Sequence, residues 1–293
     1  MKTRNKKVLV LPAPEGLKEI RELYNGEIDI IRGVFKNIEF RFNHRLVILH
    51  KGTDLKDFDF VWISSFLSTR DISRAISVYL DYHGVPHTAV NEGEGASKLI
   101  DLTHFYLNDL PTPDTFFQQR QNLCSNTDGL QSICKFPLVV KDTKGSRGRN
   151  SFLVNSKEEL LQLIDTLPRN RSFIFQEFIP NYYDWGILVA NGEVVSAEKS
   201  YPSNGEFRNN ACWGAREVFV NVDDVSSELK QIAIKSCRVL NLEWGRADIV
   251  IEKFTEDPYL LEVNRFPGMT TNSSEVGAFH NYLKGRLETD SIL

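Results

Sequence analysis

The chain has 293 residues, of which 41% are hydrophobic and 25% charged, and its formal net charge is −4. This length predicts two or three globular units, and the composition excludes a disordered chain. The slightly acidic charge gives no indication of nucleic-acid binding, and no apolar run approaches the ~18 residues that a membrane span needs. The four cysteines have no metal-binding spacing, which favours reduced thiols in a cytoplasmic protein.

The first part of the chain alternates strand patterns with helix patterns. Short apolar runs predict strands at 8–11, 45–50 and 58–65, and helical spacing predicts helices at 16–24 and 71–84. Such alternation favours a small parallel α/β sheet. We therefore expect an N-terminal α/β domain over residues 1–95.

The middle of the chain, residues 96–179, predicts a small α+β lobe. A helical pattern at 97–110 leads into an extended segment at 111–117, and strands are expected at 136–142, 151–155 and 173–179. Ser156 followed by Glu159 is a capping box, which predicts that a helix begins there and runs to residue 167.

Residues 180–293 are richer in strands. The Asn191–Gly192 pair predicts a hairpin over 185–200. A long amphipathic helix is expected at 225–242, followed by two antiparallel strands at 247–254 and 259–266.

A basic loop that contains glycine follows the strand ending at Lys141. Its segment "KGSRG" places Ser146 and Arg147 between Gly145 and Gly148. Backbone N–H groups beside glycine can approach phosphate oxygens, and Lys141 can reach them from the strand end. An ordinary solvated hairpin tip would have the same composition, so the loop alone leaves both interpretations open.

Three side chains with oxygen atoms are expected on one face of the last strand pair. Glu262 and Asn264 are two residues apart in one strand, and Asp248 lies in the preceding strand, about 4.8 Å away if the strands pair. Two carboxylates and an amide oxygen are the hard donors that suit Mg²⁺. A solvent-facing Glu262 would explain the pattern equally well.

Together and in this order, the motifs resemble those of ATP-grasp enzymes, closest to the RimK-like carboxylate–amine ligases, over roughly residues 91–270. The resemblance implies an α/β and α+β fold of the ATP-grasp type. An N-terminal parallel α/β domain would precede a central lobe (96–179) that carries the glycine-rich loop. A C-terminal lobe (180–293) would carry the metal site, and the two lobes would enclose the nucleotide.

The resemblance also assigns residues to ATP and to metal. "FQEFI" (175–179) fits the hinge that holds adenine, and "EFRNN" and "LLEVNRFPG" resemble the family's arginine–asparagine and metal signatures. The implied ATP-binding residues are Lys98, Lys141, Gly145, Ser146, Arg147, Gly148, Gln176, Glu177, Phe178, Ile179, Asp184, Arg208 and Asn210. Asp248, Glu262 and Asn264 are the implied ligands of Mg²⁺, with two ions expected and Mn²⁺ as a substitute.

Four positions depart from the family pattern. Gly186 stands where an arginine usually follows the ribose-site acid, and a second arginine is replaced near Ser200. Trp213 replaces a basic residue, and Asn150 replaces the third glycine of the loop. Positive charge is therefore lost where an acyl phosphate would form.

We consider three cations as compensation for this loss, namely Lys199, Arg265 and Arg147. The candidate catalytic residues are accordingly Arg208, Lys199 and Arg265. None of the four departures affects the implied metal ligands. The departures do put in question the identity of the substrate and the catalytic competence of the chain.

The reaction that the resemblance implies is ATP-dependent formation of an amide or peptide bond. A carboxylate attacks the γ-phosphate to give an acyl phosphate and ADP, and the amine of an amino acid, peptide or protein tail then displaces phosphate. Two alternatives stay open: an ATP-grasp small-molecule kinase and a catalytically inactive nucleotide-binding module. The oligomeric state is open as well, although a homo-oligomer would suit the family.

Overall fold

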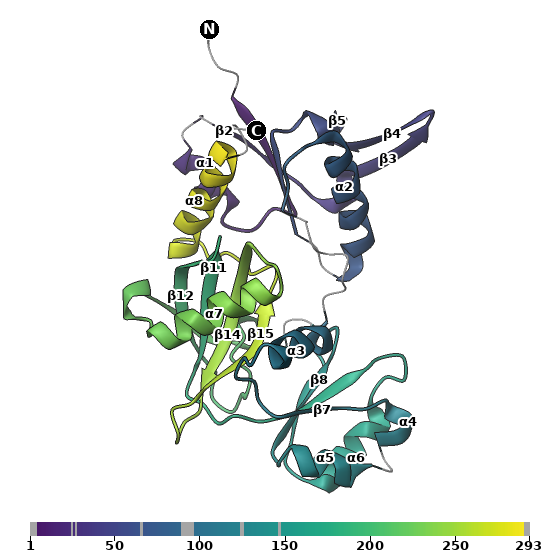
Figure 1. Ribbon diagram of the computed structural model, residues 1–293, viewed down its shortest axis with the longest axis vertical. Helices are drawn as coiled ribbons and strands as arrows, with labels where there is room; N and C mark the ends of the chain where they lie inside the picture. The colour runs from purple at the N-terminus through teal and green to yellow at the C-terminus, as the bar shows by residue number, and fades with distance from the viewer. Residues whose placement is uncertain are drawn as a thin grey trace.

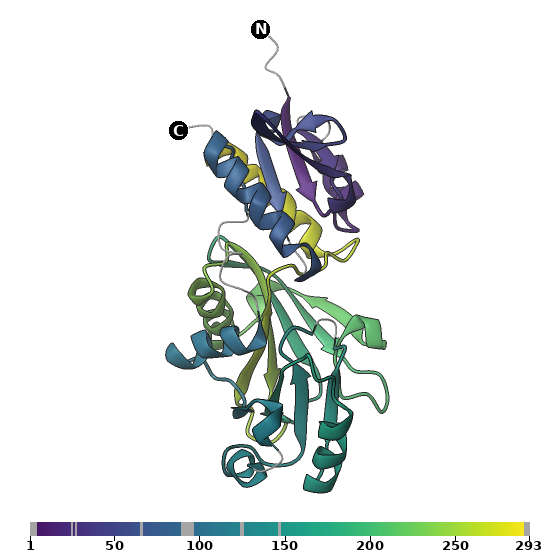
Figure 2. The same ribbon diagram turned by 90° about the vertical axis from the view of Figure 1, so that its right-hand side faces the viewer.

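The computed structural model describes residues 5–24, 26, 28–64, 67–88, 97–123, 126–145 and 148–289. Within these ranges the strands form four sheets. The parts of the molecule follow one another along its long axis, with the N-terminal sheet at one end and the middle lobe at the other (Figures 1 and 2).

The N-terminal sheet is parallel, as predicted, and has the strand order β2-β1-β6. Its strands are β1 (Lys6–Leu11), β2 (Ile28–Arg32) and β6 (Phe60–Ile63), with the helices α1 (Leu17–Leu23) and α2 (Arg70–His83) alongside. Alternate residues of β1 enter two different cores: Val8 and Val10 pack with α1, and Leu9 and Leu11 pack with α2. A parallel sheet covered on both faces explains the unbroken apolar run at this point of the sequence.

Residues 45–50 do not belong to this parallel sheet, and the prediction that included them was wrong. They form β4 (Arg45–His50), which pairs antiparallel with β3 (Ile38–Asn43) and β5 (Thr53–Asp54) in a sheet of its own. His44, with φ 53°, closes a tight turn between β3 and β4. Residues 45–50 therefore pair with β3, the strand that directly precedes them in the sequence. Strands β2 and β3 were also not predicted from the sequence.

The middle lobe is an antiparallel sheet with the order β7-β10-β8-β9. Its strands are β7 (Thr115–Phe117), β8 (Leu138–Asp142), β9 (Ser151–Val154) and β10 (Phe173–Glu177). The accompanying helices are α3 (Lys98–Leu107), α4 (Arg120–Leu123), α5 (Thr127–Ile133) and α6 (Lys157–Thr166). The cap of α6 is present: Ser156 Oγ accepts a hydrogen bond from the Glu159 N–H at 3.3 Å, while the Glu159 carboxylate accepts from the Asn155 N–H at 2.7 Å.

The C-terminal sheet is antiparallel, with the order β13-β12-β11-β14-β15. Its strands are β11 (Asp184–Ala190), β12 (Glu193–Tyr201), β13 (Arg216–Val220), β14 (Trp244–Ile251) and β15 (Pro258–Asn264). The predicted hairpin is confirmed, since Asn191 (φ 49°) and Gly192 (φ 81°) form the two-residue turn between β11 and β12. One face of the sheet packs on α7 (Ser227–Val239). On the opposite face, Leu188, Ala190 and Trp244 pack with the last helix, and the rest of that face carries polar side chains.

The last helix, α8 (Ser274–Thr289), packs on the N-terminal sheet (Figure 1). Its Phe279 is fully buried between Trp62 of β6 and Trp244 of β14, with ring centroids 4.9 Å and 5.4 Å away. This helix therefore joins the N-terminal sheet to the C-terminal sheet. Among the described helices, none combines the length and the apolar character that crossing a membrane requires.

Candidate active site

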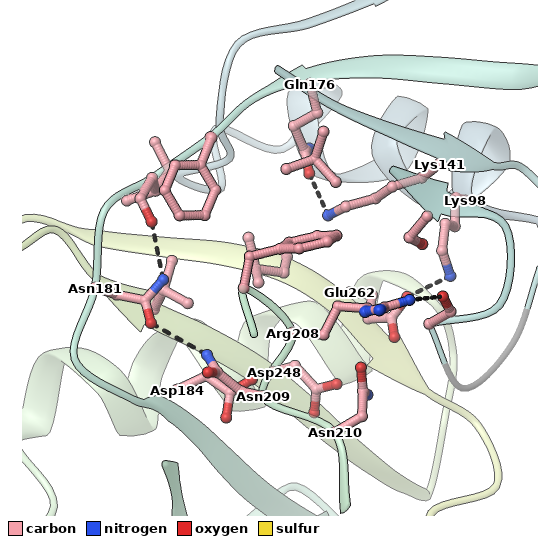
Figure 3. Close-up of a pocket in the computed structure, with 18 of the residues that line it drawn as sticks. Lys98, Lys141, Gln176, Asn181, Asp184, Arg208, Asn209, Asn210, Asp248 and Glu262 are labelled. Carbon is pink, nitrogen blue, oxygen red and sulfur yellow. Dashed lines mark hydrogen bonds and ion pairs between the residues drawn. The ribbon is translucent and has the colours of Figure 1, made fainter. Parts of the chain in front are cut away.

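A pocket lies between the middle sheet and the C-terminal sheet, with about 820 Å³ of empty space that includes open solvent. Figure 3 shows Lys98, Lys141 and Gln176 on one side of this pocket, and Asp184, Asp248, Asn209 and Asn210 on the other. Most of the predicted ATP-binding residues line it: Lys98, Lys141, Gly145, Gly148, Gln176, Glu177, Phe178, Ile179, Asp184, Arg208 and Asn210. Ser146 and Arg147 lie outside the described residues.

Two lysines of the middle lobe reach into the pocket. Lys98, the first residue of α3, forms an ion pair with Glu262 and donates to the Gly145 carbonyl at 3.3 Å. Burial alone would lower the pKa of Lys98, but the charge and hydrogen bond of Glu262 outweigh burial and raise it. Lys141 donates to Gln176 Oε1 at 2.6 Å, and burial lowers the pKa of Lys141 to about 8, with the charge of Lys98 adding to the effect.

The predicted metal ligands meet on the opposite wall. Asp248 and Glu262 are direct partners in the β14–β15 register, as the sequence predicted, and Asn264 Nδ2 donates to Asp248 Oδ2 at 2.8 Å. Burial raises the pKa of Asp248 to about 7; the charge of Arg246 opposes this rise and that of Glu262 adds to it. Two half-buried, mutually repelling carboxylates beside an amide oxygen fit a divalent cation. The described residues contain no cluster of three or more His, Cys, Asp or Glu side chains suited to a metal, so the amide is needed to complete the set.

The glycine-rich loop contacts the C-terminal lobe through Arg208. The Arg208 guanidinium donates to the Gly148 carbonyl at 3.3 Å and forms an ion pair with Glu206 at 2.7 Å. It also stacks on Trp213, 3.5 Å from the ring centroid. Trp213, which departs from the family pattern, thus orients Arg208 by a cation–π contact.

One end of the pocket is apolar, formed by the side chains of Val139, Phe178, Ile179, Val250 and Leu261. Asp184 lies at this end, at the start of β11 and paired with Val250 of β14. Burial and then the charge of Asp248 raise the pKa of Asp184 well above its ordinary value. The lining of the pocket therefore changes along β14, from apolar at one end to charged at the other.

The structure does not bring Lys199 or Arg265 to the pocket. Lys199 packs between the rings of Tyr183 and Trp185, 4.6 Å from each centroid, on the face of the sheet that α7 covers. Both terminal nitrogens of Arg265 bind the Asp101 carboxylate at 2.8 Å, on α3.

A β-bulge explains the position of Lys199. In a regular hairpin around Asn191–Gly192, Lys199 would pair with Asp184 and share the pocket face. The register shifts by one residue between Leu188 and Val189, so Ser200 pairs with Asp184 instead. A one-residue slip moves each side chain to the other face of the sheet.

Arg246 is a cation on the pocket face of this sheet that was not predicted from the sequence. It lies on β14 two residues before Asp248 and therefore on the same face. Its Nη1 lies 2.9 Å from Glu198 Oε1 and 3.5 Å from Glu275 Oε1. Burial raises the pKa of Glu198 to about 8, although the charge of Arg246 opposes the rise. The spacing "RAD" was the available signal, since it predicts an arginine and an aspartate on one strand face.

Comparisons with known proteins agree with this arrangement. The chain is 24% identical over 280 residues to a probable alpha-L-glutamate ligase of Legionella pneumophila (strain Corby), covering 92% of this chain and 90% of that protein. Its fold is similar to the VanG D-Ala:D-Ser ligase of Enterococcus faecalis, with a TM-score of 0.73, 15% identity and coverage of 97% and 100%. It is also similar to the ATP-grasp ligase PsnB complexed with minimal precursor, Mg and ADP, with a TM-score of 0.70, 14% identity and coverage of 98% and 99%.

The likeness to these solved structures confirms the predicted ATP-grasp fold. A family model described as the RimK-like ATP-grasp domain matches residues 107–280, more than half of the chain. The chain therefore belongs to the RimK-like ATP-grasp family.

Proposed function

We propose that this ligase activates a substrate carboxylate as an acyl phosphate and joins it to an amine, with release of ADP and phosphate. One observation carries the proposal. A single pocket combines Lys98 and Lys141 of one lobe with Asp248 and Glu262, in register, on the other. Phosphoryl transfer needs mainly positioning and charge neutralisation, and this set of side chains can supply both.

The pocket has an apolar end and a charged end, and this difference supports one orientation of ATP. Adenine would occupy the apolar end at Phe178 and Ile179. Because the Phe178 N–H already donates to the Pro137 carbonyl at 3.0 Å, we assign the adenine contact to the backbone of Ile179. Asp184 would face the ribose, and Lys141 the phosphates.

The charged end would hold the phosphates and the metal. Lys98, Gly145, Gly148, Arg208 and Asn210 surround it from both lobes. We propose Asp248, Glu262 and Asn264 as ligands of Mg²⁺, with two ions in the working enzyme and Mn²⁺ as a substitute. When bound, the metal would neutralise negative charge on the phosphates.

The remaining side chains would hold the reactants and exclude water. Gln176 is almost fully buried and fixes Lys141, while its own Nε2 donates to Thr115 Oγ1 at 2.9 Å. The contact of Arg208 with the Gly148 carbonyl would hold the glycine-rich loop over the phosphates. Water exclusion matters because an acyl phosphate hydrolyses readily.

We keep the division into 1–95, 96–179 and 180–293 as a proposal for three units: an N-terminal domain, a lobe with the glycine-rich loop and a lobe with the metal site. The boundary at 95 lies outside the described residues. Helix α8 belongs to the third unit in sequence but packs on the first.

The names of the relatives support amino acids or peptides as substrates. They include a probable alpha-L-glutamate ligase, a D-Ala:D-Ser ligase and a ligase bound to a peptide precursor. We therefore propose L-glutamate as the first compound to test, both as the acid and as the amine. A cytoplasmic setting, where ATP is abundant, and a homo-oligomer remain proposals.

A product screen tests this proposal. The protein is incubated with Mg·ATP and pairs of amino acids and short peptides, while ADP, free phosphate and product masses are followed. We expect equal ADP and phosphate with a product lighter than its two parts by one water. Phosphate retained on an acceptor would indicate a kinase, and ATP binding without turnover in any pair would indicate a binding module; either outcome contradicts the proposal.

The low pKa of Lys141 predicts that nucleotide affinity depends on pH. Burial lowers this pKa to about 8, so in the free protein the ammonium is present below pH 8 and lost above it. Bound phosphates favour the charged form, so affinity for Mg·ATP should fall up to about tenfold between pH 7 and pH 9, with proton uptake on binding. Calorimetry in buffers of different ionisation enthalpy measures both quantities.

Lys141→Met is the matched control for this prediction. It should bind Mg·ATP more weakly at pH 7 and lose the pH dependence between 7 and 9. Equal affinities of the unaltered protein at pH 7 and pH 9, without proton uptake, would contradict the assignment of Lys141 to the phosphates.

A further inference from the structure

One edge of the strand β3 is not paired with another strand. β3 is the end strand of the sheet β3-β4-β5, and its partner on the other edge is β4. In the part of the chain that the structure describes, residues 39–43 make no backbone–backbone hydrogen bond outside the ladder with β4. Such an edge presents a row of N–H and C=O groups to which a further strand can be added.

The apolar face of the β3–β4 hairpin continues beyond the core that it covers. Ile38 and Phe40 of β3 pack against the core of the N-terminal domain. Phe42 continues the same alternation and pairs with Leu46 of β4, but these two side chains are 80% and 37% exposed. At this point the hairpin extends away from the rest of the molecule (Figure 1). An apolar face that continues past its own core favours a partner that covers it.

The sequence of β3 is complementary to itself. The strand begins with IEFRF, so Glu39 and Arg41 share the face that points away from the core. Two copies can pair antiparallel about a two-fold axis at Phe40, and each Glu39 then lies opposite an Arg41 of the other copy. In the same register each Ile38 lies opposite a Phe42. Opposite charges and apolar side chains that face each other directly both stabilise a sheet, whereas a two-fold axis at Arg41 would place two arginines together.

Charged side chains on an edge strand can also protect it from association. Such protection requires charges that repel a second copy. In β3 the two charges have opposite signs, and Arg41 Nε lies 2.8 Å from Glu39 Oε1 along its own strand. Both side chains are more than half exposed, at 59% and 55%, so they can exchange partners with a second copy without losing a buried contact. The charges of β3 therefore favour association of the strand with itself.

We propose that β3 is an interface between two copies of this chain, which pair antiparallel about Phe40 and join their three-stranded sheets into one. The strand contains none of the residues that line the pocket, so this interface does not depend on the proposed ligase reaction. A single pair of six-residue strands buries less surface than the ~1,600 Å² of a standard interface. We therefore expect a reversible dimer.

Sedimentation velocity of the full chain, at protein concentrations from about 1 to about 200 μM, measures the association. The unaltered protein should shift from monomer towards dimer over this range. Arg41→Glu places two pairs of like charges in the interface, and Glu39→Arg does the same with the opposite sign. Each single variant should therefore associate at least about tenfold more weakly than the unaltered protein.

A mixture of the two single variants tests the register. A dimer that contains one copy of Arg41→Glu and one copy of Glu39→Arg has opposite charges at both pairs, so dimers should reappear when the two are mixed in equal amounts. The double variant that carries both changes also restores opposite charges, now within its own dimer. It should associate like the unaltered protein.

Phe42→Ser tests the apolar contact and should weaken association by about tenfold, because each copy loses a buried phenylalanine. Phe254→Ser is the matched control, since Phe254 is 76% exposed at the end of another hairpin. It should leave the association unchanged. The altered side chains are exposed in the single chain, so every variant should melt within about 2 °C of the unaltered protein.

The outcomes decide both the partner and the register. A protein that stays monomeric over the whole concentration range would overturn the interface. Dimers that persist in Arg41→Glu, Glu39→Arg and Phe42→Ser would also overturn it, because association would then use another surface. Single variants that dissociate but do not associate on mixing would contradict the pairing about Phe40.

Discussion

Glu262→Gln is expected to lower ATP turnover by about 10²- to 10³-fold, the usual cost of removing one preorganised charge-stabilising group. Glu262 is central because it pairs with Lys98 from the other lobe and lies in register with Asp248. The change removes a charge but keeps the shape of the side chain, so the fold should persist. ADP release measures turnover. A separate measurement, Mn²⁺ binding followed by electron paramagnetic resonance, tests the metal site.

Glu256→Gln is the matched control, because Glu256 is an exposed glutamate in the turn between β14 and β15. It should leave both turnover and Mn²⁺ binding unchanged. Near-normal ADP release from Glu262→Gln, or Mn²⁺ binding as tight as in the unaltered protein, would contradict the metal assignment.

Phe279→Ala is expected to cost about 3–5 kcal/mol of the free energy of unfolding, as large-to-small changes at buried phenylalanines do. Phe279 has no exposed surface and packs against Trp62 of β6 and Trp244 of β14. The cavity would therefore open where α8 joins the two sheets. Urea unfolding followed by tryptophan fluorescence measures the loss directly, since both partners are tryptophans.

Phe254→Ala serves as the control for this stability prediction. Phe254 is 76% exposed at the far end of the β14–β15 hairpin, so its loss should change the free energy by less than about 0.5 kcal/mol. If unfolding proceeds in steps, the step that exposes the N-terminal sheet should carry the loss. A cost below about 1 kcal/mol for Phe279→Ala would show that α8 does not hold the sheets together.

Features that depend on local signals could be predicted from the sequence. The Asn191–Gly192 turn and the Ser156 cap formed as expected, because turn and cap chemistry act within a few residues. Asp248 and Glu262 also face each other, but only because the register shifts by one residue between Asp248 and Ile249, which no local signal indicated. Residues 45–50 were assigned to the wrong sheet because their partner strand, β3, was not predicted from the sequence.

The sequence also could not predict which positively charged side chains lie on the pocket face of the C-terminal sheet. A regular hairpin would have brought Lys199 to the pocket, but one bulge between Leu188 and Val189 turned it to the other face and brought Glu198 there instead. Glu198 then meets Arg246 above Gly186, the position where the family usually carries an arginine. Neither the bulge nor this pairing across two strands has a local signature in the sequence.

Trapping of the acyl phosphate tests the central claim most directly. The protein is incubated with Mg·ATP, hydroxylamine and a pool of amino acids and peptides that contains L-glutamate, with Glu262→Gln as the blank. Phosphorus NMR follows the nucleotide, and mass spectrometry identifies any hydroxamate. We predict that ADP, free phosphate and one hydroxamate appear together and only with the unaltered protein. ATP that binds but stays intact, or phosphate that remains esterified to an acceptor, would contradict the account.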